Sequence, residues 1–112
     1  MLLYKGGLVE VLFKDKDLER CAVDMNFALR RMGQKRYHIY LKRIQYMLVV
    51  PNFESLRLGA GRFHELSGNR QGQWACDLDQ PYRLVFRAGE DTTGRKWVEI
   101  TKAEVLEVVD YH

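Results

Sequence analysis

The chain has 112 residues, of which 46% are hydrophobic and 29% are charged, a balance that is typical of one folded domain. No apolar run approaches the roughly 20 residues that span a bilayer, and the opening stretch MLLYKGG is too soon interrupted for a signal peptide. The formal net charge of +3 is below what a dedicated duplex-DNA binder usually carries. We therefore expect a cytoplasmic domain that does not contact a membrane.

The first half of the chain predicts a strand and two helices. Residues 8–13, LVEVLF, alternate and are rich in β-forming residues. Asp15 is a plausible N-cap for a helix that runs to Gly33, its expected stop. This helix carries an apolar stripe at three- and four-residue steps: Leu18, Cys21, Ala22, Met25, Leu29 and Met32. A second helix over 35–48 is ended by Pro51, and the short turn between the helices predicts an antiparallel hairpin.

The second half of the chain predicts a β-meander. Three short segments have a two-residue period and are separated by turn-rich joints. They are RFHEL (62–66), QWACDLD (73–79) and YRLVF (82–86), and a loop then leads to WVEI (97–100) and to the final segment EVLEVVDYH (104–112). The order of strand, helix pair and further strands predicts an α+β domain, in which the helices cover one face of a curved, mostly antiparallel sheet.

The cysteines and carboxylates give no sign of a metal centre. Cys21 falls in a helical pattern and Cys76 in a strand pattern, and there is no CxxC pair. We expect two reduced cysteines in the core. No carboxylate cluster has metal-ligand spacing, so neither a metal nor another cofactor is expected.

Charge is unevenly distributed along the chain. Acidic residues gather near 15–24 and 99–110, whereas basic residues crowd the joint between the helices and run through the strand-rich half. These basic residues are Arg30, Arg31, Lys35 and Arg36, followed by Arg57, Arg62, Arg70, Arg83 and Arg87. Such segregation can present one basic face to a polyanion, although ordinary solvated surface charge produces the same pattern.

The face of the sheet away from the helices is where we expect chemistry. In the expected register it brings together His64, Arg83 and the terminal residues 110–112, DYH. RNA cleavage needs a base for the 2′-OH proton, a cation at the phosphate and an acid for the 5′-O leaving group. Histidine can serve either proton role near neutral pH, and arginine supplies fixed charge and paired donors to a phosphate.

The same residues also have structural interpretations. A single histidine in a strand is usually structural or merely exposed. Arg83 could instead form a buried ion pair with Asp77 or Asp79. Trp74 and Tyr82 are expected to pack in the core or a hairpin rather than to stack on bases.

The segment LGAGRFHELSGNRQGQWACDLDQPYRLVF, together with the terminal DYH, resembles the HigB-like toxins of the RelE/ParE superfamily. These are the killer-protein halves of bacterial toxin–antitoxin modules, and the resemblance covers most of the chain. It implies the fold outlined above and an endoribonuclease that enters the ribosomal A site and cuts mRNA. It also implies a HigA-like helix-turn-helix antitoxin, which neutralises the toxin and represses their operon. Operator DNA would be bound only through that complex.

The resemblance also implies a set of site residues. The catalytic set is His64, Arg83, Asp110, Tyr111 and His112. Arg83 matches the basic residue that contacts the scissile phosphate. Some relatives have a lysine where this chain has Ser67, and Arg70 is the candidate to replace that charge. Arg62 and Arg87 are further candidates for RNA binding.

The chemistry of each side chain suggests its role in the reaction. His64 and His112 would handle the protons, with the acid and base roles left open. Asp110 would orient an imidazole or raise its pKa, and Tyr111 would orient the substrate by a hydrogen bond or by stacking on a base.

Two other functions remain open. A ParE-like inhibitor of DNA gyrase would share the fold but is not expected to carry His64 and the DYH set. A non-catalytic RNA-binding domain would lose function gradually as basic residues are replaced, while His64→Ala would change little.

Overall fold

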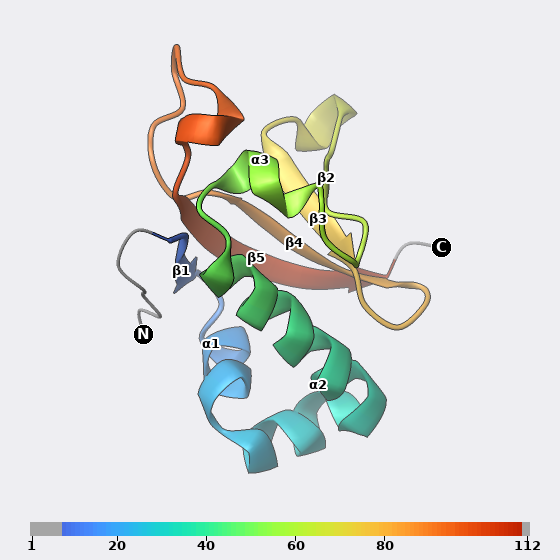
Figure 1. The fold of residues 1–112 in the computed structure, drawn as a ribbon. Helices are drawn as coiled ribbons and strands as arrows, with labels where there is room; N and C mark the ends of the chain where they lie inside the picture. The colour runs from blue at the N-terminus through green and yellow to red at the C-terminus, as the bar shows by residue number, and fades with distance from the viewer. Residues whose placement is uncertain (1–7, 111–112) are drawn as a thin grey trace.

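The computed structural model describes residues 8–110, so Tyr111 and His112 of the proposed catalytic set lie outside the described residues. In chain order the elements are β1 (Glu10–Phe13), α1 (Lys16–Val23), α2 (Met25–Val49), α3 (Phe53–Leu56), β2 (His64–Glu65), the 3-10 helix η1 (Gly68–Arg70), β3 (Gln73–Asp77), β4 (Tyr82–Ala88), the 3-10 helix η2 (Trp97–Glu99) and β5 (Lys102–Asp110). The helices α1, α2 and α3 gather on one side of a single sheet (Figure 1). The predicted α+β architecture is confirmed.

The sheet is mostly antiparallel, as predicted. Its strands are ordered β1-β5-β4-β3-β2, with β1 parallel to β5 and the other neighbours antiparallel. The β4–β5 pairing shifts register between Val85 and Phe86, and irregularities of this kind bend a strand and increase its twist. The long strand β5 is visibly curved in Figure 1. The strand predicted over 62–66 is shorter than expected, since β2 holds only His64 and Glu65.

The helix predicted to run from Asp15 to Gly33 is interrupted at Asp24. The backbone of Asp24 is extended (φ −128°, ψ 95°), and its side chain accepts a hydrogen bond from Phe27 N, so that it ends α1 and caps α2. An aspartate that bonds to nearby backbone N–H groups competes with helix continuation. As a result Met25 is 58% exposed and Ala28 is buried, contrary to the predicted apolar stripe. At Gly33, the predicted stop, the backbone leaves the helical conformation (φ 80°, ψ 165°), so α2 consists of two helical segments that meet at a kink there, as the sequence predicted.

The core lies between the helices and one face of the sheet. The side chains that fill it from α2 include Tyr40, Ile44 and Met47, and those from the sheet include Trp74, Cys76, Leu84 and Phe86. Both cysteines are free and buried. Residues 74, 76, 84 and 86 alternate along β3 and β4, so their neighbours in sequence point to the opposite face. That opposite face is left uncovered by the helices.

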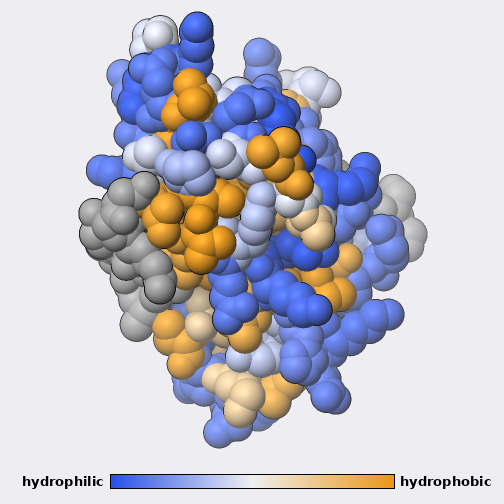
Figure 2. All heavy atoms as spheres, in the orientation of Figure 1, coloured by the Kyte–Doolittle hydropathy of each residue, from blue (hydrophilic) through white to orange (hydrophobic). Residues whose placement is uncertain are grey.

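The surface carries scattered apolar side chains. On the face shown in Figure 2, hydrophobic atoms form separate patches among hydrophilic ones. The large exposed hydrophobic residues are Val23, Met25, Leu29, Val49, Leu58 and Val98. Within residues 8–110, none of the helices combines the length and apolar composition that crossing a bilayer requires.

Candidate active site

The uncovered face of the sheet places the proposed catalytic residues of β2 and β4 side by side. His64 lies opposite Ala75, and Ala75 lies opposite Val85. Two residues along, Asp77 lies opposite Arg83. Because residues two apart on a strand share a face, His64, Asp77 and Arg83 all project from the uncovered side.

A hollow of about 450 Å³ opens at this point; it is named here the His64 hollow. Its lining residues are Arg62, His64, Leu66, Ser67, Asn69, Arg70 and Arg83. Three of them are arginines and none is a carboxylate; the carboxylates of Asp77 and Glu107, outside the lining, form ion pairs with these arginines. Oriented guanidinium groups in a concave, partly desolvated site suit a phosphate. The structure thus brings four of the proposed site residues, His64, Arg62, Arg70 and Arg83, to one hollow.

Asp77 forms ion pairs with two of these arginines, Arg62 and Arg83. Arg62 Nε and Nη2 donate to its carboxylate at 2.8 and 3.2 Å, and Arg83 Nε lies 3.2 Å from the same group. The Arg83 side chain is only 18% exposed. The predicted ion pair of Arg83 is therefore present, with Asp77 as the partner, while Asp79 pairs with Arg36 of α2 at 2.8 Å.

The ion pairs change the acidity of Asp77. Partial burial would raise the pKa of its carboxyl, but the hydrogen bond from Arg62 and the charges of Arg83 and Arg62 outweigh this and hold the pKa below its usual value. A carboxyl whose pKa is lower in the folded than in the unfolded state stabilises the fold above the unfolded pKa. This stabilisation is lost as the pH falls through the folded value.

Asp77→Asn is accordingly expected to lower the free energy of unfolding by about 2 kcal/mol at pH 7, since hydrogen bonds to a charged group are lost. The difference from wild type should begin to shrink as the pH falls below about 4, the usual pKa of an unfolded aspartate, and should vanish once the pH is below the lowered pKa of Asp77 in the fold. Urea denaturation at a series of pH values measures this. Glu54→Gln, which removes an exposed partner of Arg57, is the control and should change stability by less than about 0.5 kcal/mol. A pH-independent difference for Asp77→Asn would contradict the ionic explanation.

Arg62 occupies a strained backbone position at the edge of the hollow. Its φ is 53°, the one positive value at a non-glycine residue in the described chain, and it follows Gly61 at φ 106°. Non-glycine residues in this left-handed region cost about 1 kcal/mol or more. The two hydrogen bonds to Asp77 hold Arg62 there and keep its guanidinium beside Arg83.

The imidazole of His64 is oriented by the backbone. Its Nδ1 lies 2.5 Å from the carbonyl oxygen of Arg62. A carbonyl oxygen can only accept, so Nδ1 carries the hydrogen and Nε2 is the basic nitrogen of the neutral ring. This arrangement leaves Nε2 able to take a proton from a bound group.

The other predicted site residues are placed differently. Asp110 lies opposite Tyr82, and Val109 lies opposite Arg83. Asp110 therefore projects from the other face of the sheet from Arg83, so the register does not bring it into the His64 hollow. Arg87 lies further along β4, outside this hollow, and pairs with Glu104 at 2.8 Å.

Arg70 forms one wall of the hollow. Its Nη1 donates to Gln73 Oε1 at 2.9 Å and to Glu107 Oε2 at 3.0 Å. The sequence analysis did not propose Gln73, Glu107 or Asp77 as site residues. For Asp77 a local signal existed, because it and Arg83 are nearly equidistant from the turn that joins their strands. For Glu107, which is 37 residues from Arg70, no local signal could have found the contact.

A metal centre has no support in the described part of the chain. No three His, Cys, Asp or Glu side chains of residues 8–110 converge as metal ligands would.

Comparisons with known proteins identify the fold but not the family. No family model matches the chain, and no curated protein matches its sequence. Among solved structures, the chain is similar to a YoeB/ParE toxin from Agrobacterium tumefaciens, with a TM-score of 0.51 and 15% identity over 91% of this chain and 98% of that chain. At this identity the similarity shows the fold alone. The predicted RelE/ParE toxin-like fold is therefore confirmed.

Proposed function

We propose that this protein is the toxin of a type II toxin–antitoxin module and that it inhibits translation as a ribosome-dependent endoribonuclease. The observation that supports this is the His64 hollow, which is lined both by His64, whose Nδ1 is held by a backbone carbonyl, and by three arginines. A phosphate bound by the arginines would lie beside a group able to accept a proton. That is the arrangement that attack by a neighbouring 2′-OH requires.

The proposed reaction proceeds by proton transfer and attack within the RNA. His64 Nε2 takes the proton of the 2′-OH, and the 2′-oxygen attacks phosphorus. The bond to the 5′-oxygen breaks, and that oxygen leaves with a proton from an acid, for which His112 is the candidate. The products are a 2′,3′-cyclic phosphate and a 5′-OH. Arg83, held at Nε by Asp77, and Arg62 stabilise the negative charge that grows on the phosphate oxygens.

The proposal extends to the protein's partners. The mRNA would be positioned on the ribosome, because the mild net charge of +3 favours only weak binding to free RNA. A HigA-like helix-turn-helix antitoxin would neutralise the toxin, and operator DNA would be bound only through the complex of the two. Tyr111 would orient the substrate and Asp110 would act on the terminal imidazole.

Primer extension on a defined message in a reconstituted translation reaction tests the proposal. Wild-type protein and a chain lacking His112 are each assayed with and without ribosomes. We expect cuts at the A-site codon for wild type with ribosomes, and their loss without ribosomes or without His112. Cuts that persist without His112 would support the ribonuclease proposal but would show that His112 takes no part in the mechanism. Growth arrest in cells without any cuts would favour the gyrase-inhibitor alternative, which a supercoiling assay would then examine.

A further inference from the structure

The hydrogen-bond ladder between β2 and β3 is broken beside the His64 hollow. Leu66 N donates to Gln73 O at 2.8 Å, and in an antiparallel ladder residues that bond in this way recur at every second pair. The register of β2 and β3 would therefore bond Arg62 to Asp77. Asp77 N instead donates to Gly61 O, at 2.7 Å. The ladder thus slips by one residue at the edge of the hollow.

The slip leaves the carbonyl of Arg62 for the imidazole of His64. In a regular ladder this carbonyl would accept from Asp77 N, whereas here it lies 2.5 Å from His64 Nδ1. The positive φ values of Gly61 (106°) and Arg62 (53°) mark the place where the chain turns out of the ladder. Irregularities of this kind re-aim side chains beside a sheet. The orientation of His64 therefore depends on the slip.

Arg43 of α2 supplies the donor that the broken ladder lacks. The carbonyl of Asp77, which a regular ladder would bond to Arg62 N, accepts from Arg43 Nε at 2.8 Å. The arginine reaches it by passing over Gly61, where a Cβ atom would lie 2.5 Å from Arg43 Nε. That approach is closer than van der Waals contact, so the path of the arginine requires glycine at this position. A side chain of the helix layer thus takes the place of a backbone N–H.

The segment that precedes the break also packs closely on α2. Gly59 lies against the ring of Tyr46, with no room for a Cβ atom between them, and Tyr46 Oη donates to Ser55 O at 3.0 Å. Tyr46 and Arg43 are three residues apart, so they project from the same side of the helix. One side of α2 therefore fixes the route by which the chain enters the cleavage site.

We infer that Arg43 positions His64 by acting through the backbone of Asp77, an inference that rests on the proposed function. Arg43 Nε keeps the Asp77 carbonyl occupied, so the chain stays in the slipped arrangement. Without this donor a partly buried carbonyl would lack its bond, which is costly. The donor that a regular ladder supplies is Arg62 N. Return to that ladder would give the Arg62 carbonyl to Asp77 N and withdraw it from His64.

Two substitutions of Arg43 separate the hydrogen bond from the charge. In Arg43→Met the side chain can follow the same path over Gly61, with Cε where Nε lies, but it cannot donate. In Arg43→Gln an amide N–H falls at the position of Nε, and the charge is absent. We expect Arg43→Met to lower the rate of cleavage on the ribosome by about 10–100-fold, the usual effect of a slightly misplaced group, and Arg43→Gln to stay within about threefold of wild type.

The ring of His64 gives a readout that needs no cleavage. NMR of the ring nitrogens, at about pH 8 where an ordinary histidine is neutral, shows which nitrogen carries the hydrogen. Wild type and Arg43→Gln should hold it at Nδ1, whereas Arg43→Met should shift towards Nε2–H, the form that predominates in a free ring. Lys42→Met removes a cation from an exposed neighbour on α2. It is the matched control and should leave the His64 resonances unchanged.

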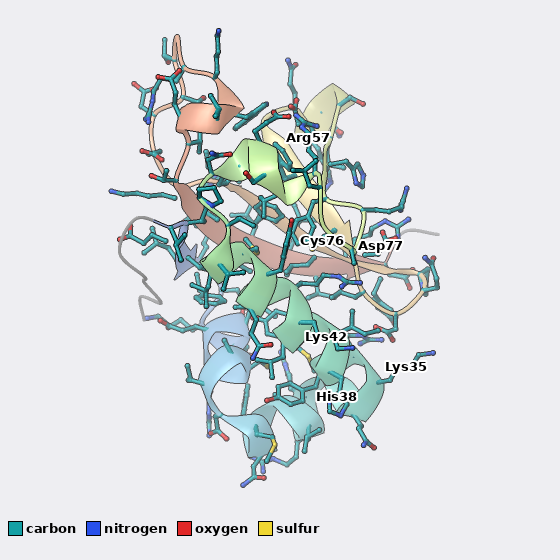
Figure 3. All side chains as sticks on the ribbon, in the orientation of Figure 1. Lys35, His38, Lys42, Arg57, Cys76 and Asp77 are labelled. Atoms are coloured by element: carbon teal, nitrogen blue, oxygen red, sulfur yellow. The ribbon has the colours of Figure 1, made fainter. Side chains whose placement is uncertain are left out.

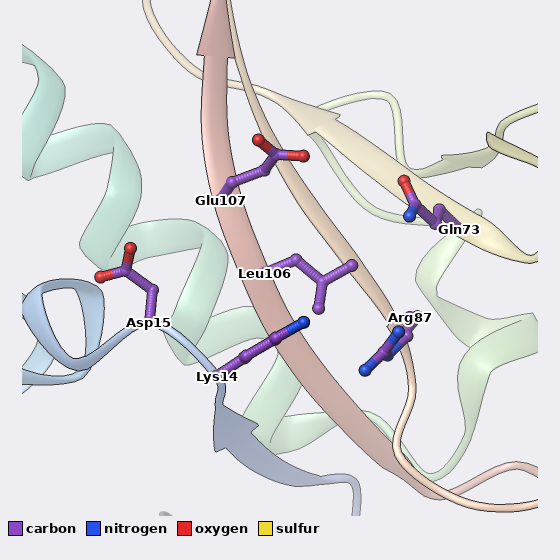
Figure 4. Close-up of a pocket in the computed structure, with 6 residues that line it drawn as sticks. All are labelled: Lys14, Asp15, Gln73, Arg87, Leu106 and Glu107. Atoms are coloured by element: carbon purple, nitrogen blue, oxygen red, sulfur yellow. The ribbon is translucent and has the colours of Figure 1, made fainter. Parts of the chain in front are cut away.

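Binding of inorganic phosphate provides a second readout. Amide shifts of Arg62 and Arg83 report binding in the His64 hollow. A separate hollow of about 520 Å³ also contains two cations, Lys14 and Arg87 (Figure 4), so shifts at their amides identify phosphate bound there instead. Arg43→Met should weaken binding in the His64 hollow by at least about threefold, since Asp77 orients both of its arginines, and should leave the other hollow unchanged.

The outcomes distinguish this inference from the proposed function. The inference would be overturned by an Arg43→Met chain whose His64 ring keeps its hydrogen at Nδ1. It would also be overturned if Arg43→Gln behaved like Arg43→Met, since Arg43 would then act through its charge. Urea denaturation of each variant shows that the NMR spectra come from folded protein. If the ring responds as expected and wild type cuts no message, the positioning of His64 stands and the ribonuclease proposal is overturned.

Discussion

His64→Ala is expected to lower the rate of message cleavage on the ribosome by about 10²–10⁴-fold, the usual effect of removing a general acid or base. The reason is the ring of His64, whose Nδ1 is held by the Arg62 carbonyl and which lines the same hollow as the arginines. Alanine leaves the arginines in place, so binding of the phosphate should change much less than the rate. Single-turnover primer extension measures the cleavage rate, and the affinity for inorganic phosphate measures binding in the His64 hollow.

His38→Ala is the matched control for this experiment. His38 lies on α2, where it lines a different, largely apolar hollow with Met25 and Leu29, and Figure 3 shows it on the helix side, apart from Asp77 at the end of β3. We expect His38→Ala to cleave at the wild-type rate. If the His64→Ala chain still cleaves within tenfold of the wild-type rate, His64 does not carry the proton transfers. The terminal residues would then be the candidates for that role.

Trp74→Ala is expected to lower the free energy of unfolding by about 3–5 kcal/mol. Trp74 is fully buried at the centre of an aromatic cluster, with ring centroids 5.4 Å from Phe53 and 5.2 Å from Trp97. The guanidinium of Arg57 lies 4.7 Å from its ring. Because a domain of this size is stable by only about 5–15 kcal/mol, the loss should be evident as a large shift of the urea midpoint.

Trp74→Phe separates the effect of the indole N–H on stability from the effect of the packing lost in Trp74→Ala. Within the described chain, the buried indole N–H of Trp74 has no hydrogen-bond partner. Phenylalanine removes this donor, whose desolvation costs about 1–3 kcal/mol, and so offsets part of the lost packing. We expect a change in stability of less than about 1.5 kcal/mol, measured by the same urea denaturation. A loss as large as that of Trp74→Ala would show that the indole N–H is satisfied in solution.

The periodic segments of the chain were predictable because their pattern is local. Alternation in residues 73–86 gave both strands of the central hairpin and the face of each side chain. The helical stripe was predictable only up to Val23, where α1 ends. Beyond it, the cap formed by Asp24 changed the phase of the helix, so Met25 became exposed and Ala28 became buried.

The candidate site was also only partly predictable from the sequence. His64 and Arg83 were proposed from residue type, from the pattern of the strands and from resemblance to a known family. The ion pair of Arg83 was expected with either Asp77 or Asp79. Arg83 pairs with Asp77 because the register of β3 and β4 places the two residues opposite each other. Asp79 lies beyond the end of β3 and reaches Arg36 on α2 instead.

What the sequence determined by itself is therefore most of the strands, the helical character of the first half and the chemistry of single residues. These depend on propensity and periodicity within a few positions of each residue. Only the tertiary structure decided the parallel pairing of β1 with β5 and the contacts between Arg70 and Glu107 and between Arg36 and Asp79. The partners in these two contacts are 37 and 43 residues apart. Such pairings arise from how whole elements pack around one core, and no short window of sequence contains both partners.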